Sequence, residues 1–499
     1  MNAPKHSKPI TCRYVFKIKK DENGNILKFK ARLVAQGFRQ IQGINYHETY
    51  SPVAKMSTLR SAIAVASING MRLHHIDVNT AYINAELEEE IYMLAPQGME
   101  IPENKVLRLK KSIYGLKQAG LNWHLCISQL LTKLGFTQCI SDPCSFVKDQ
   151  QSLDFLTILI LYVDDIIIGS KDPQRIQDIK NAIISKFDIE DLGELRYYLG
   201  INFTSDPNGI HMSQRSYIEQ LVNKYKLSNA NPVQTPLPVS FRLDTQEQLS
   251  EDQLEYVSRF PIRELIGALN YIAVCTRPDI SFAVGFLARY QDRPSLTICK
   301  AIRHVLKYLN STKNLYLCFS GRVNSLVGYS DADWAGDPAS KRSTTGFIFY
   351  LGNSPISWQS KIQPTVALST TEAEYIALST ATQEAVWLRS LFREWGFSMY
   401  MPTTIWSDNN GAIQLTYNPV HHRRTKHIEI KFHFIRDKVK SNHIVVDKIH
   451  TSEMIADLLT KNTSIQIQSN LTHKLMGIGD PIEPSPKRIR IFKKIMKKE

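Results

Sequence analysis

Two adjacent aspartates, Asp164 and Asp165, interrupt an otherwise apolar stretch, and this interruption constrains the fold more than any other feature of the chain. The flanking runs, 156–161 and 166–168, have strand length and are rich in β-branched residues, which is typical of buried strands. Neighbouring side chains on a strand point to opposite faces, so both acids can aim at one point only at a turn. The pattern predicts a β-hairpin with the acid pair at its tip.

An acid pair beside an apolar core has two interpretations. Two carboxylates in such a place are costly unless a cation neutralises them, and ligation by oxygen alone favours Mg²⁺ or Mn²⁺. The alternative is a solvated turn, because aspartate is common in turns. The pair by itself leaves both interpretations open.

Composition limits the class of protein. A length of 499 residues suggests about three domains. The net charge of +14 favours a polyanionic partner. The seven cysteines are too scattered for a zinc finger and odd in number, which indicates a reducing compartment. Because we find no signal peptide and no apolar run of membrane-spanning length, we expect a soluble intracellular protein without a membrane partner.

The chain separates into regions of different composition. Residues 1–225 alternate strand-like and helix-like segments, and 226–322 form a polar, proline-marked tether followed by a helical stretch. Residues 323–465 resume strands and helices, and 466–499 are predicted to be a disordered basic tail. The end of this tail is either a nuclear import signal, an extra phosphate-binding arm or a solvated end.

A third acid is needed if the Asp164–Asp165 pair belongs to a site for two metal ions. Asp77 is the best candidate, because it follows a short apolar segment and precedes a helix-like stretch. Taken alone, an aspartate in this position is more often a helix cap.

Several long segments, in a consistent order, resemble the reverse transcriptase of copia-type retrotransposon Pol polyproteins. Tyr162 and Val163 complete a YVDD box of the kind found in reverse transcriptase palms, which favours the metal-binding interpretation of the acid pair. The other similar segments are FKARLVAQGFRQIQGINYHETYSPVAKMSTLR (29–60), IDVNTAYINAELEEEIYM (76–93), LKKSIYGLKQAGLNW (109–123), DLGELRYYLGI (191–201) and TRPDISFAV (276–284).

The resemblance implies an α+β fold: a right-hand polymerase of fingers, palm and thumb with the YVDD hairpin, a helical connection, and an α/β RNase H-like domain. It also implies that Asp77, Asp164 and Asp165 hold two Mg²⁺ (or Mn²⁺) ions. The residues that it implies for nucleotide binding are Tyr82 beneath the deoxyribose, Lys30 and Arg32 at the triphosphate, and Tyr114 and Gly115 lining the pocket. Leu199 and Gly200 are implied to seat the primer end.

Four further acids lie on separate elements of the C-terminal part: Asp331 at a strand end, Glu374 on a long amphipathic helix, Asp408 after an apolar strand and Asp457 on a short amphipathic helix. Taken alone, each of these acids is interpreted as a helix cap, a turn residue or a surface acid. Together they resemble the metal site of the RNase H domain in the same family. Asp333 is a weaker rival to Asp331.

The basic segment 418–436 is interpreted as the surface that faces an RNA–DNA hybrid, with His427 in a box that is similar to the family's RTKHI. The pair His421-His422 could indicate zinc, but no cysteine pair accompanies it and solvated histidines are the commoner case.

The sequence therefore predicts an RNA-directed DNA polymerase with a linked RNase H. Its expected partners are an RNA template, a DNA primer, the RNA–DNA hybrid and deoxynucleoside triphosphates. We expect it in the cytoplasm, in a virus-like particle, and in the nucleus if the tail is an import signal. The alternative is an inactive or co-opted fragment that only binds nucleic acid. Two features support this alternative: the fingers region is short, and the loop 119–121 departs from the family's Ser-Pro-Arg.

Overall fold

The computed structural model of the chain describes residues 1, 8–20, 26–102, 105–243, 247–321, 325–417 and 429–479. Contacts divide the chain into two compact units, the first made of residues 1–55 and 72–194 and the second of 56–71 and 195–499. None of the helices in the described ranges combines the length and the hydrophobicity that crossing a bilayer requires.

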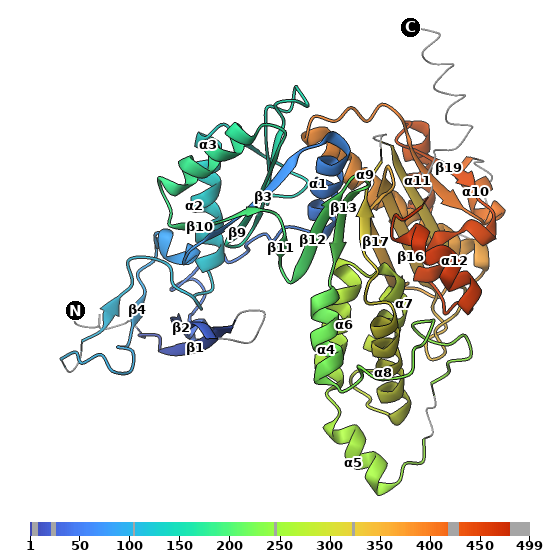
Figure 1. Cartoon of the computed structure of the whole chain (residues 1–499), viewed down its shortest axis with the longest axis horizontal. Helices are drawn as coiled ribbons and strands as arrows, with labels where there is room; N and C mark the ends of the chain where they lie inside the picture. The colour runs from blue at the N-terminus through green and yellow to red at the C-terminus, as the bar shows by residue number, and fades with distance from the viewer. Residues whose placement is uncertain are drawn as a thin grey trace. The chain divides into compact units, whose positions relative to one another are not determined.

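The first unit is built mainly of strands (Figure 1). Its elements are β1 (Cys12–Lys20), β2 (Ile26–Ala35), η1 (Gly37–Arg39), β3 (Arg72–Val78), η2 (Ala81–Asn84), β4 (Tyr92–Met93), β5 (Leu107–Arg108), α2 (Ala119–Lys133), β6 (Thr137–Gln138), β7 (Ser145–Lys148), β8 (Thr157–Tyr162), β9 (Asp165–Ser170), α3 (Pro173–Ile184) and β10 (Ile189–Glu194).

The predicted acid-tipped hairpin is confirmed, and it lies in the middle of an antiparallel sheet of order β10-β3-β9-β8-β7-β6. Tyr162 pairs with Asp165, so Val163 and Asp164 form the turn. The apolar side chains of β8 and β9 are buried, as their composition predicts. The strand β3 pairs with β9 and sets Asp77 directly opposite Asp165.

The two-stranded ribbon of β1 and β2 (blue in Figure 1) carries cationic side chains on one face and aromatic side chains on the other. Lys17 pairs with Lys30, and two residues further along β2 Arg32 pairs with Val15. Because side chains alternate along a strand, Lys30 and Arg32 lie on one face. The opposite face carries exposed rings, among them Phe16 and Phe29.

The second unit holds the remaining elements. They are α1 (Met56–Asn69), β11 (Tyr197–Tyr198), β12 (Ile201–Asp206), β13 (Gly209–Ser213), α4 (Arg215–Lys224), α5 (Glu251–Arg259), α6 (Ile262–Cys275), η3 (Pro278–Ile280), α7 (Ser281–Ala288), α8 (Leu296–Ser311), β14 (Leu317–Phe319), β15 (Leu326–Ala332), β16 (Thr344–Leu351), β17 (Ser354–Ile362), α9 (Thr370–Glu394), β18 (Thr403–Ser407), α10 (Asn410–Tyr417), α11 (Glu429–Lys440), β19 (Ile444–Lys448), η5 (Thr451–Glu453), η6 (Ile455–Leu459) and α12 (Ile465–Leu475).

The helical stretch predicted in the second part of 226–322 is confirmed by α6, α7 and α8, which share one apolar core with α4. The flanking segments contain two helices that the sequence did not predict, and the second contradicts the disordered tail expected from residue 466. The tether contains helix α5, whose start is fixed by a capping box between Ser250 and Gln253. The tail expected from residue 466 begins with α12, because Leu471 and Leu475 are buried in a core cluster with η6.

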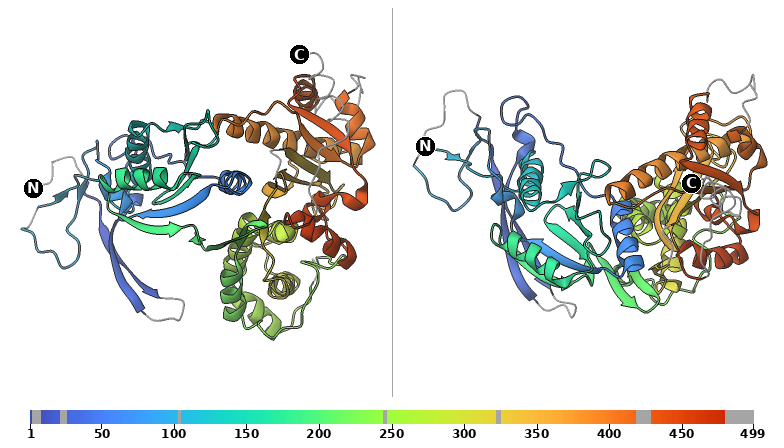
Figure 2. Two further views of the ribbon diagram at one scale, coloured as in Figure 1. Left: turned by 45° about the horizontal axis from the view of Figure 1, so that its top comes forward. Right: turned by 90° about the horizontal axis from the view of Figure 1, so that it is seen from above.

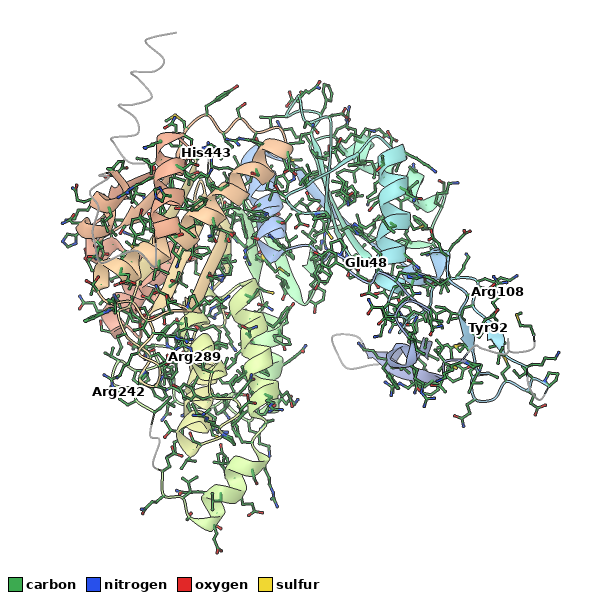
Figure 3. The ribbon with its side chains drawn as sticks, turned by 180° about the vertical axis from the view of Figure 1, so that it is seen from behind. Glu48, Tyr92, Arg108, Arg242, Arg289 and His443 are labelled. Atoms are coloured by element: carbon green, nitrogen blue, oxygen red, sulfur yellow. The ribbon has the colours of Figure 1, made fainter. Side chains whose placement is uncertain are left out.

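A five-stranded sheet of order β17-β16-β15-β18-β19 forms the C-terminal part of this unit. The strands β17, β16 and β15 are antiparallel to one another. In contrast, β18 pairs in parallel with β15, and β19 pairs in parallel with β18. The long helix α9 lies against β15 and β16 (Figure 2). Arg289 at the end of α7, labelled in Figure 3, pairs with Asp337 in the loop after β15. This pair ties the helical connection to the sheet.

A buried ion pair joins the helices at the TRPD segment. The guanidinium of Arg277 donates to both oxygens of Asp279, at 2.9 and 2.7 Å, and both side chains are almost fully buried. Tyr308 donates a further hydrogen bond to Asp279, and Gln468 of α12 donates to the Tyr308 hydroxyl. The network therefore connects the helical core with α12.

Replacing Asp279 leaves the buried guanidinium of Arg277 without its partner. Breaking such a pair from one side costs about 3–5 kcal/mol, so Asp279→Ala should lower the thermal unfolding midpoint strongly. Asp292→Ala is the matched control, because the Arg263–Asp292 pair is exposed and contributes at most about 1 kcal/mol. Equal effects of the two variants would contradict this role of the network.

Candidate active sites

The first acidic site gathers at the tip of the β8–β9 hairpin. Asp77 and Asp165 are register partners on adjacent strands, so their side chains share one face of the sheet. The amide of Val78 donates to the carbonyl of Asp164 at 2.8 Å, which holds the turn against the end of β3. The structure thus brings together the three acids that the sequence predicted. In the part of the chain that is described, their carboxylates do not converge within 4.8 Å as a trio.

Asp165 has a partner that sequence reasoning missed. Its carboxylate Oδ1 lies 2.7 Å from Nε2 of His75, a buried residue of β3. His75 precedes Asp77 by two residues, and this spacing puts both on the same face of the strand. The neighbouring His74 points to the other face, where its Nδ1 lies 2.9 Å from Nζ of the buried Lys180. The spacing of His75 and Asp77 was the available signal.

The electrostatics of Asp164 are set by burial and by its neighbours. Burial and the adjacent Asp165 raise the pKa of Asp164, while the charges of Arg32 and Lys30 act in the opposite direction. The two cations predicted to meet a triphosphate therefore lie within electrostatic range of the predicted metal ligand. Their common face on β2 explains why they act together.

The two predicted pocket tyrosines meet beside this acid. The rings of Tyr82 and Tyr114 make an edge contact, with centroids 4.7 Å apart. The guanidinium of Arg32 lies 5.1 Å from the centre of the Tyr114 ring. Burial raises the pKa of both hydroxyls, and the charge of Asp164 adds to this effect. The cluster joins aromatic, cationic and acidic side chains in one place.

Gly115 is required by the chain's own packing. It has a φ of 91°, and a Cβ there would lie 2.1 Å from the carbonyl oxygen of Ala35. Its predicted contact with a nucleotide stays a prediction. The residues that depart from the family pattern, 119–121, form the first turn of α2, so the loop expected there is helical.

Leu199 and Gly200 form the turn between β11 and β12 in the second unit. Both have positive φ, 49° and 74°, and the hydroxyl of Tyr271 donates to the Leu199 carbonyl. Their role at a primer end stays a prediction. His427 and the pair His421-His422 lie outside the described residues.

The second acidic site lies at the edge of the five-stranded sheet. Asp331 is the penultimate residue of β15, Asp408 follows β18, and Glu374 comes from the second turn of α9. Because β15 and β18 are parallel neighbours, their carboxyl ends meet at one edge. Among the described residues, these three acids form a group whose ligand oxygens all lie within 4.8 Å of one another.

Asp457 reaches the same place from η6, a 3₁₀-helix where the sequence predicted a short amphipathic helix. Two neighbours in its own segment were missed. Lys461 lies 2.8 Å from Asp457 and 4.0 Å from Asp331, and Thr460 donates to Asp331 at 2.5 Å. The rival Asp333 accepts the amide of Thr344 and stands outside the group.

The pKa values of this site reflect burial and mutual repulsion. Burial, followed by the charges of Asp331 and Asp408, raises the pKa of Glu374 well above its usual range. Burial and Asp331 raise the pKa of Asp457 to about 7. The raised pKa values of Glu374 and Asp457 show that these two buried carboxylates lack sufficient compensating positive charge. The site offers oxygen donors alone, which fits Mg²⁺ or Mn²⁺.

Known proteins are similar in sequence to this chain over most of its length. The family model described as reverse transcriptase (RNA-dependent DNA polymerase) matches residues 1–239. The retrovirus-related Pol polyprotein from transposon TNT 1-94 of Nicotiana tabacum is 39% identical over 466 residues, which cover 92% of this chain and 35% of the relative. A putative transposon Ty5-1 protein of Saccharomyces cerevisiae is 30% identical over 314 residues, 62% of this chain and 100% of the relative.

The chain spans about a third of the length of the curated plant Pol polyproteins that it matches. Among solved structures, the foamy viral protease-reverse transcriptase in complex with dsDNA aligns with 87% of this chain and 77% of its own, at 12% identity and a TM-score of 0.46.

The raised pKa values fix the sign of a pH effect. In an unfolded chain these acids lose their protons near pH ~4, whereas in the folded chain Asp457 keeps its proton up to about 7. The folded state therefore binds more protons across this window, and stability falls as the pH rises through it. A divalent cation takes the place of the protons, so it should stabilise most above the window.

Without a divalent cation, we expect the thermal unfolding midpoint to fall between about pH 5 and about pH 8, and Mg²⁺ to restore it mainly at the upper pH. The control is the double variant Glu374→Gln with Asp457→Asn, in which both the pH slope and the Mg²⁺ response should shrink. A Mg²⁺ response of the unsubstituted chain that is the same at both pH values would contradict the account.

Proposed function

The chain belongs to the copia-type family of retrotransposon Pol proteins, with a reverse transcriptase region and an RNase H-like portion, and from this premise we propose that it is an RNA-directed DNA polymerase with a linked ribonuclease H. The observation that carries the proposal is that two separate groups of acids meet in the fold, each beside cationic side chains. The substrates are an RNA template, a DNA primer and deoxynucleoside triphosphates, and the RNA–DNA hybrid is the substrate of the second site.

In this proposal the first unit and the start of the second form the fingers, palm and thumb of a right hand. The β1–β2 ribbon belongs to the fingers, and the sheet that carries the acid-tipped hairpin is the palm. The helices α6, α7 and α8 form the connection, and the sheet from β15 to β19 is the RNase H-like domain. The turn at Leu199 and Gly200 contacts the primer end.

The side chains of the polymerase site have separate roles in binding the metal ions and the triphosphate. Asp77, Asp164 and Asp165 hold the metal ions, and His75 contacts one carboxylate oxygen of Asp165 at 2.7 Å. Lys30 and Arg32 neutralise the triphosphate, whose charge would otherwise add to that of the acids. When bound, Mg²⁺ or Mn²⁺ supplies Lewis-acid stabilisation of the attacking and leaving oxygens.

The aromatic pair gives the pocket its selectivity. The ring of Tyr82, packed edge-on against Tyr114, lies beneath the sugar of the incoming nucleotide. A rigid ring in that position leaves no room for a ribose 2′-hydroxyl, so the site takes deoxynucleotides. Both rings are half-buried and in contact with each other, which supports their fixed orientation.

The RNase H site is built from Asp331, Glu374, Asp408 and Asp457. Its acids hold the metal ions, and Thr460 and Lys461 orient Asp331 and Asp457 through the contacts of 2.5 and 2.8 Å. Hydrolysis of the RNA strand requires an activated water and a stabilised leaving oxygen, which a site of this composition provides. Selection of the hybrid relies on groove shape and on the 2′-hydroxyl of one strand.

The polymerase proposal is tested by incorporation of labelled dTTP on poly(rA)/oligo(dT) with Mg²⁺ or Mn²⁺. Asp164→Asn with Asp165→Asn should reduce incorporation by at least about a hundredfold, because the charge that holds the metal ions is lost. Glu374→Gln is the matched control, which should abolish cleavage of the RNA strand and leave incorporation intact. A folded chain that binds the hybrid but incorporates nothing would favour the inactive or co-opted fragment instead.

Selectivity for the sugar gives a second test. Tyr82→Ala opens space beneath the nucleotide, so the use of rUTP relative to dTTP should rise by about tenfold or more. Tyr82→Phe keeps the ring and should keep the selectivity. If both variants discriminate as well as the unsubstituted chain, Tyr82 does not line the sugar pocket.

A further inference from the structure

The turn that presents Asp164 contains a backbone conformation that its sequence disfavours. Val163 has a φ of 58°, in the left-handed region, where a β-branched side chain crowds the backbone. Conformations of this kind cost about 1–3 kcal/mol and persist only when the surroundings impose them. Some contact outside the hairpin must therefore hold Val163 in place.

The contact comes from helix α2. The indole Nε1–H of Trp123 donates to the carbonyl oxygen of Val163 at 2.6 Å. On the other side of the turn, the amide of Val78 donates to the carbonyl of Asp164 at 2.8 Å. Both carbonyls of the turn are thus bound by groups outside the hairpin, so the two peptides that flank the Cα of Asp164 are both held.

Trp123 is itself held rigidly. It is 1% exposed, and its ring packs edge-on against Phe187, with centroids 5.2 Å apart. An indole has one polar hydrogen, which a buried tryptophan places on an acceptor. Its acceptor here is the turn that carries the predicted metal ligand, although Trp123 lies forty residues earlier in the chain.

We infer that Trp123 is a positioning residue for Asp164: its indole N–H holds the Val163 peptide in the left-handed conformation and so fixes the direction of the Asp164 carboxylate. This inference rests on the proposed polymerase function, which gives Asp164 its part in the reaction. Without the hydrogen bond, Val163 relaxes toward negative φ and the carboxylate moves. A displacement of about 1 Å at a reacting site costs up to about a hundredfold in rate.

The experiment compares Trp123→Phe with Phe187→Leu in dTTP incorporation. The first variant removes the N–H and keeps an aromatic ring, while the second loosens the packing around the indole and keeps the N–H. We expect Trp123→Phe to lower kcat about tenfold with little change in the KM for dTTP. We expect Phe187→Leu to keep kcat within about twofold at a similar loss of thermal stability. Equal kcat values in the two variants would overturn the inference.

A rescue separates the hydrogen bond from general packing. Glycine adopts left-handed φ at no steric cost, so Val163→Gly removes the need for an external hold. In the Trp123→Phe background, Val163→Gly should therefore recover most of the lost kcat. A double variant as slow as Trp123→Phe alone would overturn the role assigned to the Val163 peptide.

A readout without turnover distinguishes this inference from the proposed function. Mn²⁺ binding is measured by electron paramagnetic resonance, with dTTP and a primer that ends in a dideoxynucleotide. The second acidic site is silenced for this purpose by Asp331→Asn and Asp408→Asn. Trp123→Phe should weaken Mn²⁺ binding about tenfold and Phe187→Leu should not. A chain that incorporates no dTTP yet shows this difference refutes the polymerase proposal and retains the inference, whereas equal Mn²⁺ binding refutes the inference.

Discussion

Burial of carboxylates beside one another governs both acidic sites, because removal from water and the charge of the neighbouring acids both disfavour ionisation. At the hairpin, burial and Asp165 raise the pKa of Asp164, and Arg32 and Lys30 offset part of that effect. At the sheet edge, Glu374 is buried against Asp331 and Asp408, and its pKa is raised much further. Such arrangements are stable only with protons or cations bound. The folds around the two sites therefore serve to hold unfavourable charge in place.

The two sites hold their acids close together with different secondary-structure elements. At the first site, antiparallel register sets Asp77 opposite Asp165, and a turn held from outside adds Asp164. At the second, two parallel strands end at one edge with Asp331 and Asp408, and the helix α9 crosses to supply Glu374. The rigid frame in each case is a buried sheet, and the acids lie at or near the ends of its strands.

The local sequence pattern is sufficient to predict the hairpin around Asp164, because apolar runs of strand length flank an acid pair. It was also sufficient for Glu374, whose helix has a regular apolar stripe. The side chains that contact these acids cannot be predicted from the local sequence pattern. His75, Trp123 and Lys461 act through contacts that depend on strand register or on tertiary packing. A capping-box pattern was present at α5 and was overlooked, whereas α12 is helical only because its leucines are buried against η6.

If both groups of acids bind cations, diffraction from crystals of the full chain grown with Mn²⁺ will locate the ions. Anomalous scattering at the manganese edge locates the ion without reference to activity. We expect one peak among Asp331, Glu374 and Asp408 and another beside Asp77 and Asp164. Crystals with neither peak at millimolar Mn²⁺, or with ions bound only elsewhere on the surface, would contradict this expectation.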